Sequence, residues 1–68
     1  MTRETQVRTR ALEKQLSVFT TAINEVNLEI LRSTEAHRYE DIADLTLLRT
    51  GFIFDADKTI AHINSLRD

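Results

Sequence analysis

The chain has 68 residues and a mass of 7.9 kDa, enough for one small domain. With no cysteine, no proline and a single glycine, it has no disulfides or Cys-based zinc sites, and it lacks the turn residues that a β-sandwich or barrel needs. Nine Lys/Arg against eleven Asp/Glu give a net charge of −2, which argues against nucleic acid as the main partner, because phosphate binding needs clustered positive charge.

The first half of the chain carries an apolar heptad pattern, whose members are Leu12, Leu16, Phe19, Ile23, Val26 and Ile30. Alternating spacings of four and three residues are typical of a helix that packs against another helix. The pattern predicts an amphipathic helix over about residues 4–32. Continuing the same seam would place His37, Asp41 and Asp44 on the apolar face, so a single unbroken helix is disfavoured.

Residues 33–37 are predicted to form a turn between two helices. Ser33 and Thr34 are both capable helix N-caps, and Glu35 would suit the positive N-terminal end of a following helix. A connection of this length joins antiparallel neighbours. We therefore expect a second helix over about residues 36–66.

The residues of the main apolar face of this second helix all lie within about 80° of one direction in the helical projection, and Arg49 and Thr59 fall in the same arc. Its members are Ile42, Leu45, Leu48, Phe52, Ile53, Ala56, Ile60, Ile63 and Leu66. The predicted fold class is all-α: an antiparallel two-helix hairpin, coiled-coil-like, forming one domain over residues 1–68. Its expected core consists of Leu16, Phe19, Ile23, Val26, Leu45, Phe52, Ile60 and Ile63.

A second set of apolar residues projects from the opposite side of the second helix. We call it the outer stripe; its members are Ala43, Leu47, Phe54 and Ala61, with Tyr39 at its edge and Gly51 beside it. Single surface apolar residues are normal, but the spacing of seven between Leu47, Phe54 and Ala61 favours a contact surface. These six residues are the candidate partner-binding site, and the aromatic ring of Phe54 is the expected anchor.

The sequence offers little catalytic or membrane-binding chemistry. His37 and His62 are far apart, and neither has a second His or a Cys at metal-ligand spacing. There is no Gly-rich phosphate loop, no apolar run of 18 residues and no basic-plus-apolar leader. We expect a cytoplasmic protein that is not an enzyme, binds no metal or cofactor and does not contact a membrane.

The segment Glu35-Ala36-His37-Arg38-Tyr39, followed by a long helix with an isoleucine-rich end, resembles one known family. It is similar to the small E-type co-chaperones of type III secretion needle subunits, which carry an acidic-Ala-x-x-Tyr element between two antiparallel helices. The resemblance covers about residues 12–66. It implies a cytoplasmic module that pairs with a tetratricopeptide-like chaperone and helps to keep a needle subunit unpolymerised.

Two other functions stay open at this point. Two hairpins could form a four-helix bundle, which would make the chain a structural homo-oligomer. Alternatively, the chain could be a small phage or plasmid regulator that acts on nucleic acid or on a host protein. The partner is accordingly a helical-repeat chaperone, a needle subunit or a second copy of the chain, and the sequence does not distinguish between them.

Overall fold

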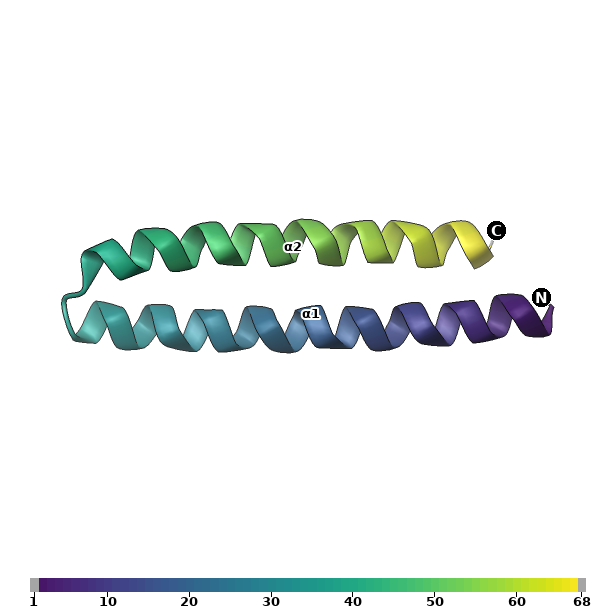
Figure 1. Ribbon diagram of the computed structural model, residues 1–68, viewed down its shortest axis with the longest axis horizontal. Helices are drawn as coiled ribbons and strands as arrows, with labels where there is room; N and C mark the ends of the chain where they lie inside the picture. The colour runs from purple at the N-terminus through teal and green to yellow at the C-terminus, as the bar shows by residue number, and fades with distance from the viewer. Residues whose placement is uncertain (1, 68) are drawn as a thin grey trace.

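A computed structural model describes residues 2–67 as two long antiparallel helices joined at one end (Figure 1). Helix α1 spans Arg3–Glu35 and helix α2 spans Tyr39–Arg67. Within these residues there is no strand. The predicted all-α helical hairpin is therefore confirmed.

The first helix begins at a capping threonine. The Thr5 backbone N–H donates a hydrogen bond to the Thr2 side-chain oxygen at 3.1 Å. In the first turn, Glu4 forms an ion pair with Arg8 at 2.7 Å. The N–H groups at this end of a helix have no intrahelical partners, so a side-chain acceptor and a nearby carboxylate both favour a helix start here.

The turn occupies residues 36–38, so it begins at Ala36 rather than at Ser33 as predicted. The prediction that Ser33 and Thr34 cap the second helix is wrong. Ser33 is 2% exposed because it is the last α1 residue to face α2, and the Thr34 hydroxyl donates to the Ile30 carbonyl within α1 at 2.8 Å. Burial at the seam decides this boundary over capping propensity.

The end of α1 forms a Schellman motif. The Arg38 N–H donates to the Ser33 carbonyl at 2.8 Å, and the His37 N–H donates to the Thr34 carbonyl at 3.2 Å. This motif requires a left-handed residue, which is His37 with a φ of 57°. Glycine is the usual residue there, so the turn is built without the residue that normally marks it in a sequence.

The contact between the helices is a continuous heptad seam on both helices. In α1 it consists of Thr5, Thr9, Leu12, Leu16, Phe19, Ile23, Val26, Ile30 and Ser33. In α2 it consists of Ile42, Leu45, Arg49, Phe52, Ala56, Thr59, Ile63 and Leu66. All of these residues are buried or half-buried, and their spacing alternates between three and four as in a coiled coil.

Polar seam residues are accommodated by hydrogen bonds. The Thr9 and Thr59 hydroxyls donate to backbone carbonyls one turn earlier in their own helices, at 2.8 and 2.9 Å. The Arg49 guanidinium donates across the hairpin to the Asn27 side-chain oxygen at 2.9 Å. Among the described residues, no buried side-chain nitrogen or oxygen is left without a partner. Arg49 and Thr59 are therefore members of the seam rather than breaks in it.

The expected core is correct for seven of its eight residues, and Ile60 is the error. Ile60 is 42% exposed, and Leu48 and Ile53, which were assigned to the same main face, are exposed as well. These three side chains flank the seam. A two-helix hairpin covers only one stripe of each helix, so flanking positions stay open where no third element packs on them.

Two contacts between residues far apart in sequence mark the antiparallel register. The Phe19 and Phe52 rings lie with centroids 6.5 Å apart and planes tilted by 40°. At the open end of the hairpin, Arg67 pairs with Glu13 at 2.9 Å. Tilted aromatic pairs at this distance add to the energy of burial, whereas an exposed ion pair contributes little.

The molecule is a rod of 52 × 14 × 11 Å with a radius of gyration of 15.7 Å. A compact chain of this length would have a radius of about 11 Å. The accessible surface is 5218 Å², against about 4,400 Å² for a compact protein of this mass. Among residues 2–67, the buried apolar side chains are three, namely Val26, Ala56 and Ile63. Much apolar surface therefore stays in contact with solvent.

Candidate protein-binding surface

The outer stripe lies on the side of α2 that faces away from α1. Leu47 is 73% exposed and Phe54 is 58% exposed, and the smaller members Ala43 and Ala61 are exposed as well. Leu47, Phe54 and Ala61 fall midway between successive seam positions of the heptad, which places them opposite the contact with α1. They cannot reach the first helix of their own hairpin.

Lys58 partly covers the aromatic member of the stripe. Its ammonium nitrogen lies 4.6 Å from the centroid of the Phe54 ring, within the range of a cation–π interaction. The ring is thus sheltered on one side by a flexible side chain that can move aside.

Gly51 sits one turn from both Leu47 and Phe54 and is exposed inside α2. It does not have a positive φ, and a Cβ added to it would meet nothing within 4 Å. The hairpin itself therefore gives no reason for glycine at this position. Glycine inside a helix costs about 1 kcal/mol relative to alanine, so something outside the hairpin must account for it if it has a role.

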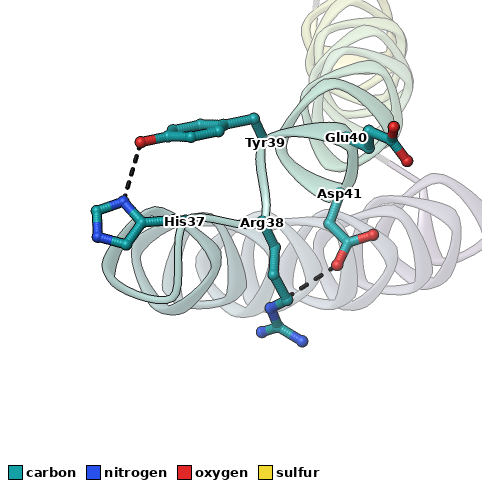
Figure 2. A pocket seen from close by; sticks show the side chains of 5 residues that line it. All are labelled: His37, Arg38, Tyr39, Glu40 and Asp41. Carbon is teal, nitrogen blue, oxygen red and sulfur yellow. Dashed lines mark hydrogen bonds and ion pairs between the residues drawn. The ribbon is translucent and has the colours of Figure 1, made fainter.

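Tyr39 stands apart from the rest of the predicted site. Its hydroxyl lies 2.9 Å from the His37 ring nitrogen Nδ1, and the side chain reaches back over the turn (Figure 2). Together with Arg38, Glu40 and Asp41 these residues line an open hollow of about 470 Å³. Tyr39 is thus the first residue of α2, with its side chain over the turn, while the other five predicted residues lie further along the outer side of α2.

The side chains of this hollow interact with one another. Besides the His37–Tyr39 contact, Arg38 pairs with Asp41 at 3.8 Å (Figure 2). His62 is exposed on α2, far along the chain from His37. In the part of the chain that the structure describes, no three His, Asp or Glu side chains are grouped so that they could hold a metal ion.

Three more exposed apolar residues, Leu48, Ile53 and Ile60, extend the apolar surface of α2 along both flanks of the seam. All three were predicted to lie on the main apolar face, and Ile60 also in the core, so their exposure was not anticipated from the sequence. Arg49, Ala56 and Ile63 are seven residues apart, and Thr59 lies three residues after Ala56 and four before Ile63. This heptad spacing was the sequence signal that could have distinguished the seam residues from the flanking residues. Neither α1 nor α2 is long and apolar enough to span a bilayer.

Comparisons with protein families, with curated proteins and with solved structures find no match to this chain. The exposure and alignment of the outer stripe are therefore the observations that bear on function.

Proposed function

We propose that this chain is a non-enzymatic protein-binding module that offers the outer stripe of α2 to a partner. The observation that carries the proposal is the exposure of Leu47 and Phe54, two large apolar side chains seven residues apart, on the face turned away from α1. A helix packed on one neighbour is normally polar on its far side. Apolar groups aligned there favour a second contact.

Burial of the large apolar side chains of the stripe would contribute substantially to the free energy of binding. Full burial of a leucine or phenylalanine side chain contributes about 1.5–3 kcal/mol. Loss of both contacts should therefore weaken binding by about 100-fold or more. An apolar stripe on a preformed helix is the surface that partners with a hydrophobic groove recognise.

The finer proposal is a cytoplasmic co-chaperone that pairs with a helical-repeat chaperone and keeps a type III secretion needle subunit unpolymerised. Its support is the resemblance of the segment Glu35–Tyr39 to the E-type co-chaperones, together with the hairpin fold. A hairpin with few buried apolar side chains among its described residues gains stability when a partner covers its exposed face.

Photocrosslinking in the native cell tests the proposal. A photoreactive amino acid replaces Phe54 in one variant and Val18 in the control; Val18 is 65% exposed but lies on α1. We expect a crosslinked protein adduct from position 54 and none from position 18, with the adduct identified by mass spectrometry. Equal labelling from both positions, or none from either, would contradict the proposal.

A matched pair of double variants adds a quantitative arm. Leu47→Ser with Phe54→Ser removes the stripe, whereas Val18→Ser with Leu31→Ser removes comparable exposed apolar surface from α1. Both should keep their helicity by circular dichroism. Only the first double variant should fail to pull down the protein identified by crosslinking. If it still binds that protein, Leu47 and Phe54 are ordinary surface residues.

A further inference from the structure

We infer that the outer stripe is two-fold self-complementary and that free chains pair through it, α2 against α2, antiparallel around an axis beside Gly51. The inference rests on the proposed function, since it uses the same surface. When no other partner is present, the protein bound to the outer stripe is a second copy of this chain. Three independent features of α2 support it.

The first feature is the spacing of the two large apolar residues. Leu47 and Phe54 lie at nearly equal distances on either side of the Thr50–Gly51 bond. When a second α2 lies antiparallel with that bond on the axis, Leu47 meets Phe54 of the partner subunit, and Phe54 meets the partner's Leu47. Both large side chains on each copy are then covered by an apolar group, and a two-fold axis requires this kind of reciprocity.

The second feature is charge. Asp44, Gly51 and Lys58 form a line of exposed residues, seven apart, beside the outer stripe. In the antiparallel arrangement Asp44 faces Lys58 of the partner subunit, and the symmetry creates this pair twice. On the other flank Asp57 faces the partner's Ala43, so no like charges meet. A parallel pairing would instead bring Lys58 to the partner's Asp57 and leave Asp44 opposite the partner's Ala43, so only the antiparallel arrangement gives Asp44 an opposite charge across the contact.

The third feature is Gly51 itself. Nothing in the hairpin fills the space where its Cβ would lie, and its φ is not positive, so a side chain would be tolerated in the single chain. At the axis of the pair, Gly51 of one copy lies against the backbone of the other. A residue without a side chain lets two helices approach closely enough for the neighbouring leucine and phenylalanine to interdigitate.

The outer stripe is long enough for two copies of α2 to pack along it. Residues 40–61 span about 33 Å of helix. A stable protein–protein contact removes about 800 Å² from each partner, so the pair must use most of this length. The lysine over the Phe54 ring only has to swing away from its own ring to reach the partner's Asp44.

Sedimentation of the purified chain over a range of concentrations tests the pairing. We expect a monomer–dimer equilibrium. Asp44→Lys alone and Lys58→Asp alone should each raise the dimer Kd by about tenfold, because both copies then place like charges together. The double variant should restore the original Kd. A chain that stays monomeric at millimolar concentration, or single and double variants with equal Kd, would overturn the inference.

Because the chain has no cysteine, single introduced thiols report the orientation directly. Oxidation of the Gly51→Cys variant should give a covalent dimer within the dimer's concentration range. Lys58→Cys should not, because the two thiols would lie about 20 Å apart in the antiparallel pair. Efficient crosslinking through position 58 and not through 51 would refute the antiparallel arrangement. Circular dichroism of each variant confirms that the hairpin is intact.

These results separate the inference from the proposed function. A monomeric chain that still gives a cellular adduct with another protein through position 54 overturns self-pairing and leaves the proposed function standing. A cellular adduct with the mass of two copies of this chain supports self-pairing and argues against a separate partner. A monomeric chain with no adduct contradicts both.

Discussion

His37 holds the left-handed position that ends α1, and its replacement by glycine is expected to stabilise the hairpin. A side chain with a φ of 57° costs about 1–2 kcal/mol, which glycine avoids. Two effects act against this gain. The exposed contact with the Tyr39 hydroxyl is lost, and glycine adds freedom to the unfolded chain, which together offset roughly half of it. We expect a net gain of about 0.5–1 kcal/mol.

Thermal unfolding followed by circular dichroism measures this effect. For a domain of this size, such a gain raises the melting temperature by about 2–8 °C. The control is His37→Ala, which removes the contact with Tyr39 but keeps a side chain in the left-handed conformation. Alanine should therefore lower the melting temperature. If glycine and alanine lower it equally, the strain assigned to His37 is absent and the Schellman motif does not govern the turn.

The packing of α2 gives two further predictions. Ile63→Ala should cost about 2–5 kcal/mol, because Ile63 is buried in the seam, whereas Ile60→Ala, three residues earlier and exposed, should cost less than about 1 kcal/mol. Equal losses in chemical denaturation would contradict the seam described above. Gly51→Ala should stabilise the dilute, monomeric hairpin by about 1 kcal/mol in the same measurement, since the added methyl group meets open space. If the variant monomer is less stable, the space around Gly51 is not open as described.

The sequence predicted the first helix and the fold well because its seam is purely apolar between Leu12 and Ile30. Periodicity alone is then sufficient to show which side is buried. The second helix was harder to interpret, since apolar residues occur on all of its sides and two seam positions are polar. Arg49 donates to Asn27 on α1, a partner that is visible only in three dimensions, and Thr59 donates to the Asp55 carbonyl of its own helix.

The turn was misplaced for a different reason. Ser33 and Thr34 have the chemistry of helix caps, and nothing in the local sequence says that Ser33 is needed as the last buried position of the seam. The left-handed residue is a histidine, so the glycine that normally marks a helix end was missing as a signal. The outer stripe, by contrast, was visible from the sequence, because Leu47, Phe54 and Ala61 keep a strict spacing.

The short turn also gives the hairpin a direction of assembly. Seam contacts next to residues 36–38 close a very small loop, whereas Glu13 and Arg67 are 54 residues apart. Closing a long loop first costs more chain entropy than extending a contact already made, so pairing is expected to start at the turn and zip toward the open end. The same order in reverse makes the two termini the first part of the rod to fray, while the helix ends beside the turn stay paired longest.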